Sequence, residues 1–311
     1  MEGNNQTTVT EFLLLGFSGQ SDQEEVVFGV FLWTYLVTLI GNFLIILAIS
    51  CDPHLHTPMY FFLANLSSVD ICFSSVTVPK MLVNHLVGNR SISYMGCMTQ
   101  MYFFITFGNM DGFLLSAMAY DRYVAICRPL HYSLIMRPRL CVLLVAISWV
   151  ITNMHALFHT LLMIRLTFCS DNTVHHFFCD PYPLLKLSCS DTFINDMAAF
   201  TEGGVIFLTP FTCIVVSYAY IFSNVLRVPS ARGIRKALST CGSHLTVVSL
   251  FYGAILGVYM HPSSSFSVSD MVATVLFTVM TPLLNPFIYS LRNHDIKAAL
   301  RMIILRIRKK N

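Results

Sequence analysis

The sequence has very little charge for its length. Only 11% of its 311 residues are Asp, Glu, Lys or Arg, and 55% are hydrophobic, whereas soluble chains usually carry about 25% charged residues. Polar residues do not recur every 3.6 positions along the apolar stretches, so these stretches offer no water-facing side for a soluble helix bundle. The composition therefore excludes an ordinary soluble protein and predicts an all-α membrane protein.

Charge is absent from four long apolar stretches and scarce in three more. A helix of about 20 apolar residues, rising ~1.5 Å per residue, crosses a hydrocarbon core of ~30 Å. We therefore expect a seven-transmembrane helix bundle over residues 26–292, preceded by an extracellular segment (1–25) and followed by a tail (293–311). The expected spans are 26–49, 59–86, 97–120, 140–164, 197–226, 237–260 and 271–291.

The first 25 residues lack Lys and Arg, and 15 of the 19 basic residues fall on the opposite side of the expected membrane. The positive-inside rule then predicts an extracellular N-terminus and a cytosolic C-terminus in a multi-pass protein of the plasma membrane. With no basic leader or cleavage site, the first span is expected to be an uncleaved anchor. Asn5-Gln6-Thr7 predicts glycosylation of Asn5. The net charge of +3 then suits membrane lipid and a cytosolic partner, and is no sign of nucleic-acid binding.

The tail carries apolar residues at Ile296, Leu300 and Ile303 on one side and Lys297 and Arg301 on another. Such a pattern predicts an amphipathic helix over residues 295–308 that lies on the inner membrane surface. Packing of the same helix against a cytosolic protein is the alternative.

The sequence has no recognisable motif for catalysis or transport. There is no nucleophile–base pair and no phosphate-binding loop, so we expect no enzyme. Seven spans without an inverted repeat argue against a transporter, although acids inside the spans keep an ion path open as an alternative. A rhodopsin-like receptor for a peptide or lipid is a second alternative, against which the short N-terminal segment argues.

Four of the ten cysteines, Cys97, Cys169, Cys179 and Cys189, lie on the expected outer side, where disulfides persist. Four cysteines allow three pairings, and spacing alone does not choose among them. Neighbouring His175 and His176 make a metal site an alternative use of this loop, but disulfides are favoured. No metal is therefore predicted.

His155 and His159 lie four residues apart in the fourth span, a spacing that could hold a metal. A polar packing face is the favoured interpretation.

Acids inside the spans are costly and therefore informative. Helix rise places Asp70 and Asp111 at about the same depth, which indicates a sodium site or a shared proton. Asn42, His244 and Asn285 fall at similar depths. Buried hydrogen bonds that tie the helices together are the alternative, and no other cofactor is expected.

Several motifs carry a family resemblance that covers essentially the whole chain. Asp121-Arg122-Tyr123 and Asn285-Pro286-Phe287-Ile288-Tyr289 resemble the two signatures of rhodopsin-like G-protein-coupled receptors. Longer strings resemble vertebrate odorant receptors: LHTPMY (55–60), MAYDRYVAIC (118–127), HFFCD (176–180), KALSTCGSHL (236–245) and PLLNP (282–286). Most rhodopsin-like receptors have a Trp and a Pro in the middle of the sixth span, and residues 237–260 contain neither. Odorant receptors share this departure.

This resemblance implies a receptor that binds a small volatile in the outer half of the bundle and activates a heterotrimeric stimulatory G protein, raising cyclic AMP. It also implies the disulfide Cys97–Cys179, which leaves Cys169–Cys189 as the second pair. It assigns G-protein coupling and activation to Asp121, Arg122, Tyr123, Tyr218, His244, Asn285, Pro286 and Tyr289.

Two further absences narrow the expected ligand. The seventh span has no Lys to anchor retinal, and no acid stands between Met101 and Met110, where amine receptors place their counter-ion. A neutral volatile is therefore favoured, with Glu202 the main reservation. The expected ligand-facing residues are Phe104, Ile105, Gly108, Asn109, Gly112, Glu202, Ile206, Phe207, Tyr252, Ile255 and Tyr259.

Overall fold

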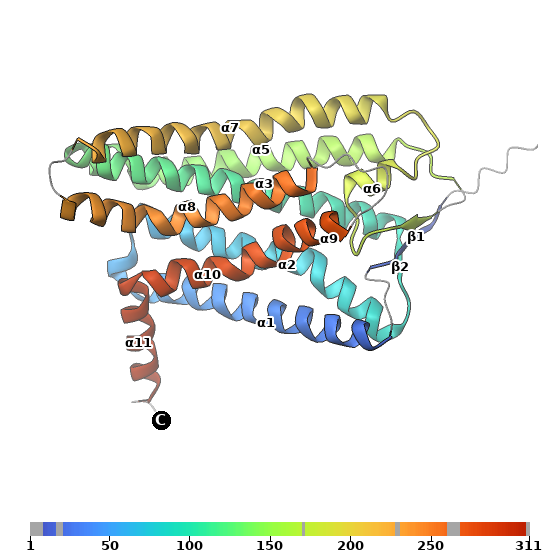
Figure 1. Cartoon of the computed structure of the whole chain (residues 1–311), viewed down its shortest axis with the longest axis horizontal. Coiled ribbons are helices and arrows are strands. Elements are labelled where there is room, and N and C mark those ends of the chain that lie inside the picture. Colours follow the sequence, from blue (N-terminus) through green and yellow to red (C-terminus); the bar gives the residue numbers. More distant parts are fainter. Residues whose placement is uncertain (1–8, 17–20, 170–171, 228–230, 260–267, 309–311) are drawn as a thin grey trace, which may run out of the picture.

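Seven long helical segments run side by side and form the bundle in the computed structural model (Figure 1), which describes residues 9–16, 21–169, 172–227, 231–259 and 268–308. Six are single helices: α1 (Ser21–Cys51), α2 (Pro58–Val87), α3 (Tyr94–Cys127), α5 (Pro138–Ile164), α7 (Phe193–Val225) and α8 (Ala231–Tyr259). The seventh is made of α9 (Val268–Val275), η3 (Leu276–Met280) and α10 (Thr281–Arg292). Each corresponds to one predicted span, so the predicted seven-helix bundle is confirmed.

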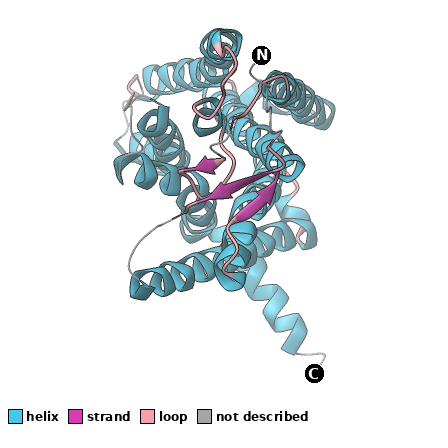
Figure 2. Cartoon of the chain, turned by 90° about the vertical axis from the view of Figure 1, so that its right-hand side faces the viewer, coloured by secondary structure: helices cyan, strands magenta, loops and turns pink. Residues whose placement is uncertain are grey.

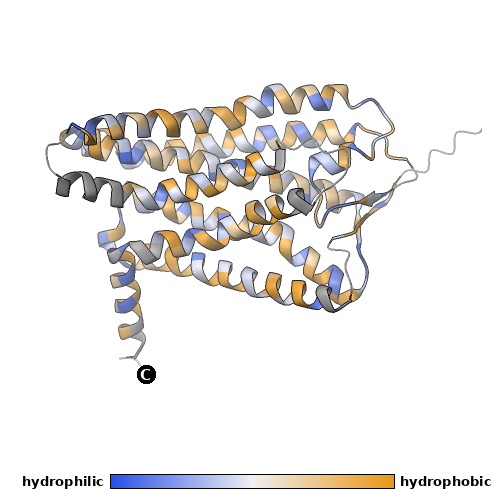
Figure 3. Ribbon diagram, viewed as in Figure 1, coloured by the Kyte–Doolittle hydropathy of each residue, from blue (hydrophilic) through white to orange (hydrophobic). Residues whose placement is uncertain are grey.

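The outside of this bundle suits a membrane. Among the described residues, five segments are long and apolar enough to cross one: Glu25–Cys51, Pro58–Val87, Pro138–Ile164, Phe193–Val225 and Val272–Tyr289. The helices α3 and α8 are not among these five. Helix α3 carries Asp111, Asp121 and Arg122, and the apolar part of α8 is shorter, Cys241–Gly257. Large side chains such as Trp33 and Phe200, 62% and 82% exposed, point outward. Apolar residues follow the lengths of the helices (Figure 3) and give lipid tails an apolar surface.

Local sequence signals explain where the helices start and stop. Pro58 opens α2, where its missing N–H costs nothing, and Gly88 ends it with a left-handed φ of 68°. Helix α3 begins at a serine cap, since the Ser93 hydroxyl accepts a hydrogen bond from the Gly96 N–H at 3.1 Å. Pro138 opens α5 in the same way as Pro58 opens α2.

The seventh span is not the single continuous helix that we predicted. A π-helical turn, η3, separates α9 from α10. There the Thr281 hydroxyl donates a hydrogen bond to the Leu276 carbonyl, five residues earlier, at 3.0 Å. The extra residue of a π turn rotates the two halves relative to each other. Hydropathy cannot detect such a turn, because the residues stay apolar through it.

A small sheet at one end of the bundle makes the all-α prediction incomplete. Strand β1 (Glu11–Leu14) lies between β2 (Ser91–Ser93) and β3 (Thr173–Val174), antiparallel to β2 and parallel to β3. Figure 2 shows the three strands lying across the end of the helices. Phe12 of β1 is fully buried and packs on Tyr94 and Phe168. Four residues of alternation are too few to predict a strand whose partners are distant loops. We call this end the sheet end.

The opposite end, which we call the α11 end, carries the short helices η1 (Pro53–Leu55), η2 (Pro129–His131) and α4 (Tyr132–Ile135). There the predicted tail helix is present as α11 (His294–Arg308), which turns away from the direction of the bundle helices (Figure 1). Ile296 and Ala299 are buried, whereas Lys297 and Arg301 are exposed. The Tyr60 hydroxyl of α2 donates to the Asp295 carboxylate at 3.1 Å, which ties α11 to the bundle.

Candidate functional site

Aromatic rings pack against the third span where the sequence predicted a ligand site. Phe104 of α3 lies 4.6 Å from Phe178 of the loop between α5 and α7, and 5.4 Å from Phe73 of α2, measured between ring centroids. One turn further along, a Cβ on Gly108 would lie 3.4 Å from a ring carbon of Phe277. Glycine at this position lets the rings lie directly on the backbone of α3.

Tyr252 of α8 continues this aromatic wall toward the fifth span. Its ring lies 5.2 Å from Phe207 and 4.9 Å from Phe211 of α7, between centroids. Its hydroxyl would lie 3.5 Å from a Cβ on Gly112. Within the described part of the chain the hydroxyl is buried and has no hydrogen-bond partner. A buried hydroxyl without a partner is costly, and a ligand with a hydrogen-bonding group could satisfy it.

The other residues predicted to face a ligand divide into two groups. Ile105, Asn109, Ile206 and Ile255 are half-buried on α3, α7 and α8. The side chain of Tyr259 lies outside the described residues. Sequence reasoning did not single out Phe73, Phe178, Phe251 or Phe277, which complete the aromatic wall; only the string 176–180 pointed toward one of them.

Glu202 points toward the fourth span. Its carboxylate oxygens lie 2.7 and 2.8 Å from Nδ1 of His155, and one of them lies 2.9 Å from Nε2 of His159. The two histidines follow each other by one turn on α5, which faces α7 (Figure 1). The structure thus joins Glu202 to the histidine pair that the sequence flagged separately.

A cavity of about 190 Å³ lies elsewhere, at the sheet end. It is lined by residues of β1 and the turn after it, α1, α2 and the loops beside them: Leu14, Leu15, Gly16, Val27, Phe28, Met81, Leu82, Asn84, His85, Gly88, Arg90 and Phe177. None of these residues was predicted to face a ligand.

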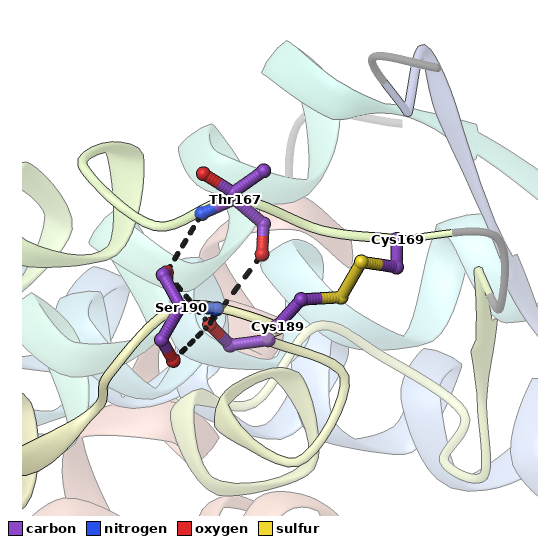
Figure 4. Close-up of a disulfide and its surroundings, with 5 residues drawn as sticks. Thr167, Cys169, Cys189 and Ser190 are labelled. Atoms are coloured by element: carbon purple, nitrogen blue, oxygen red, sulfur yellow. Dashed lines mark hydrogen bonds between the residues drawn. A yellow bond between two sulfur atoms is a disulfide. The ribbon is translucent and has the colours of Figure 1, made fainter. Parts of the chain in front are cut away.

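Two disulfides secure the loop between α5 and α7, and both have the pairing that the family resemblance implied. Cys97–Cys179 joins this loop to the first turn of α3, and Cys169–Cys189 closes the loop on itself. Figure 4 shows the second bridge beside a backbone hydrogen bond of 2.9 Å from the Cys189 N–H to the Thr167 carbonyl. With all four sulfurs bonded, the loop has no thiolate to offer a metal.

Two ionisable groups close in sequence to Cys179, Asp180 and His176, are buried. Asp180 caps the short helix α6 (Pro181–Leu185), accepting a hydrogen bond from the Tyr182 N–H at 3.0 Å. Burial raises the pKa of Asp180 to about 6. Burial also lowers the pKa of His176 to about 3, so this imidazole is neutral at physiological pH.

At the α11 end, the residues that the resemblance assigned to activation are linked across helices. Asp121 accepts a hydrogen bond from the Tyr132 hydroxyl at 2.7 Å. His244 of α8 is fully buried, with one ring nitrogen 2.9 Å from the Tyr218 hydroxyl of α7 and the other 3.0 Å from the Leu115 carbonyl of α3. Three helices therefore meet at this imidazole. Arg122 is buried, and Tyr123 packs on Tyr220 of α7.

The two intramembrane acids are buried in the middle of the bundle. Asn285 of α10 donates to both carboxylate oxygens of Asp70, at 3.1 and 2.9 Å. Asn42 of α1 donates to the Pro282 carbonyl at 3.1 Å, which ties α1 to the same stretch of α10. One oxygen of Asp111 is buried without a partner among the described residues. Such an oxygen fits either a proton or a bound cation.

The comparisons with known proteins agree on one family. A family profile described as "Olfactory receptor" matches residues 31–307. Olfactory receptor 1f45 of Rattus norvegicus is 60% identical over 305 residues, covering 98% of this chain and 97% of its own length. Olfactory receptor 1F1 of Homo sapiens is 58% identical over 308 residues, covering 99% of both chains. This is a family of signalling receptors, and no enzyme is implied. The chain belongs to the olfactory receptor family.

Proposed function

We propose that this receptor binds a small, neutral volatile between α3, α7 and α8, in the half of the bundle nearer the sheet, and activates a stimulatory G protein that raises cyclic AMP. The observation that carries the proposal is the Tyr252 hydroxyl, which is buried, unpartnered among the described residues and directed at Gly112. Apolar walls with one fixed polar group suit a small ligand of low polarity.

We propose that the sheet end lies outside the cell and that the α11 end lies in the cytosol. Both disulfides lie at the sheet end, which suits an oxidising compartment. Glycosylation of Asn5, which lies outside the described residues, is part of the same proposal. Exposed basic residues of α11 would then meet anionic lipid and the G protein.

Activation follows from a shift in population. An odorant that binds better when α8 is displaced from α3 would favour that arrangement. His244 then becomes the point where the helices separate, because its imidazole lies between the Tyr218 hydroxyl and the Leu115 carbonyl. A ligand of about 10 heavy atoms would bind with micromolar rather than nanomolar strength.

The test is a panel of volatiles on cells that carry the receptor and a cyclic-AMP reporter. Tyr252→Phe removes only the unpartnered hydroxyl, and we expect it to raise the half-maximal concentration of a hydrogen-bonding odorant about tenfold. Tyr102→Phe is the matched control, because its hydroxyl already bonds to Asn153 at 2.6 Å. Equal responses of wild type and Tyr252→Phe would contradict the proposed binding site, and an unchanged response of Arg122→Ala would contradict the coupling role.

We also propose that Asp70 and Asp111 hold a sodium ion or share a proton. Both carboxylates are buried, one Asp111 oxygen has no partner among the described residues, and helix rise predicts the same depth for the two acids, which supports this. Basal signalling of the wild type should change when sodium is replaced by choline, or when pH changes, and Asp111→Asn should remove that response. A wild type insensitive to both sodium and pH would overturn it.

A further inference from the structure

The strongest unexplained feature of the molecule is the cluster of His155, His159 and Glu202 between α5 and α7. One ring nitrogen of each histidine and one carboxylate oxygen of Glu202 all lie within 4.8 Å of one another. The two rings stand 4.5 Å apart between centroids. His155 is 8% exposed and His159 14%, whereas the Glu202 side chain is 39% exposed. The cluster is thus mostly shielded and can be approached from the side of the carboxylate.

We propose that this cluster binds a divalent transition-metal ion of the zinc type. Two imidazoles and one carboxylate form the ligand set of open zinc sites, in which the fourth position is left to water or another ligand. Histidines four residues apart on a helix present both rings to the same side, as they do here. The third ligand comes from a second helix, so that the ion would join α5 to α7.

The three side chains must rotate to accept the ion. Nitrogen and oxygen ligands about 2.0–2.2 Å from a tetrahedral metal stand roughly 3.3 Å apart. The observed separations between the histidine nitrogens and the Glu202 oxygens are 2.7–2.9 Å. Side-chain rotation can supply the difference of roughly half an ångström at these pairs, and it must also bring together the two histidine nitrogens, which lie within 4.8 Å of each other.

The protonation states of the two histidines are also compatible with a bound metal ion. Each neutral imidazole has one N–H and one lone pair, and the proton can sit on either nitrogen. When the protons of His155 and His159 occupy the nitrogens that face away from Glu202, the two facing lone pairs become ligands without any change of charge. The carboxylate would then offset half of the charge of a dication, and a hydroxide in the open fourth position would offset the rest, which matters because net charge is costly at membrane depth.

The donor set predicts which ions bind. Imidazole suits zinc, copper and nickel, whereas magnesium and calcium prefer sites made of oxygen atoms. The site should therefore bind Zn²⁺ or Co²⁺ in the presence of excess Mg²⁺. Hydrogen bonds from both histidines to Glu202, with no metal, are the competing arrangement.

The experiment uses the full-length receptor, purified in lipid nanodiscs, with no odorant or G protein, so its result does not depend on the proposed function. Co²⁺ is titrated while its visible absorption is recorded, and Zn²⁺ is then added as a competitor. We expect one bound ion, displaced by Zn²⁺ and unaffected by Mg²⁺. His155→Ala and His159→Ala should each weaken binding at least tenfold, whereas His131→Ala, at the α11 end, should not change it.

Glu202→Gln keeps the experiment decisive if a histidine variant fails to fold. A glutamine amide can still exchange hydrogen bonds with both imidazoles, but it is a poor metal ligand. This variant should fold like the wild type and bind Zn²⁺ at least tenfold more weakly. Equal Zn²⁺ binding by wild type and Glu202→Gln, or no binding by the wild type, would overturn the proposal.

Discussion

The side-chain amide of Asn285 in α10 lies 3.1 and 2.9 Å from the two carboxylate oxygens of Asp70 in α2. Both residues are buried, so the amide replaces water that the carboxylate would otherwise bind. This contact joins two spans that are separated by 215 positions in the sequence.

Removing the amide should therefore destabilise the receptor. Asn285→Ala leaves the Asp70 carboxylate without a hydrogen-bond donor among the described residues, and we expect a loss of about 1.5–3 kcal/mol. Thermal unfolding of purified Asn285→Ala, Asp70→Asn and the double variant measures the coupling between the two side chains. Strictly additive losses would mean that the contact contributes no stability.

His244 should matter more than its partner Tyr218. His244→Ala leaves both the Tyr218 hydroxyl and the Leu115 carbonyl without this partner, and so should cost about 2–4 kcal/mol. Tyr218→Phe loses only one of the two contacts and should cost about 1 kcal/mol. Basal cyclic AMP and unfolding temperature, measured on both variants, test this order. The opposite order would show that the contact with Leu115 is unimportant.

Gly41 of α1 lies directly against Pro286 of α10. A Cβ placed there would lie 3.0 Å from the Pro286 Cβ, a ring carbon with little freedom to move. Gly41→Val should therefore push the two helices apart at a cost of about 1–3 kcal/mol. Gly29→Val in the same helix is the matched control, because a Cβ there meets nothing within 4 Å. Surface expression and thermal unfolding of the two variants measure this difference. Equal stability of Gly41→Val and Gly29→Val would contradict the prediction.

Asp180 should make the loop between α5 and α7 sensitive to pH. Burial raises its pKa from 3.8 to about 6, so the folded receptor binds this proton more tightly than the unfolded chain does. Its contribution to stability is therefore fully present below about pH 4 and is lost as pH rises through about 6, by up to about 3 kcal/mol.

Asp180→Asn tests this, because asparagine can keep the cap on the Tyr182 N–H without ionising. The difference in unfolding temperature between variant and wild type should grow in favour of the variant as the pH rises from 4 to 7. A difference that does not depend on pH would show that Asp180 does not titrate in this range.

Hydropathy and helix length were sufficient to predict the spans. A backbone in lipid must satisfy its own hydrogen bonds, which favours helices, and the side chains that face the lipid must be apolar. The ends of α2, α3 and α5 were also encoded locally, by Pro58, Ser93 and Pro138. The motifs that carry the family resemblance are contiguous strings, so the family could be recognised from the sequence alone.

Contacts between distant segments could not be read in this way. Strand β1 exists only because two loops lie beside it, and the turn η3 leaves no mark in hydropathy. Side-chain direction was equally hidden, because nothing in the sequence indicated that the Glu202 carboxylate meets His155 and His159. Helical spacing states which residues share a face, but only the packing of α5 against α7 decides which neighbour that face meets.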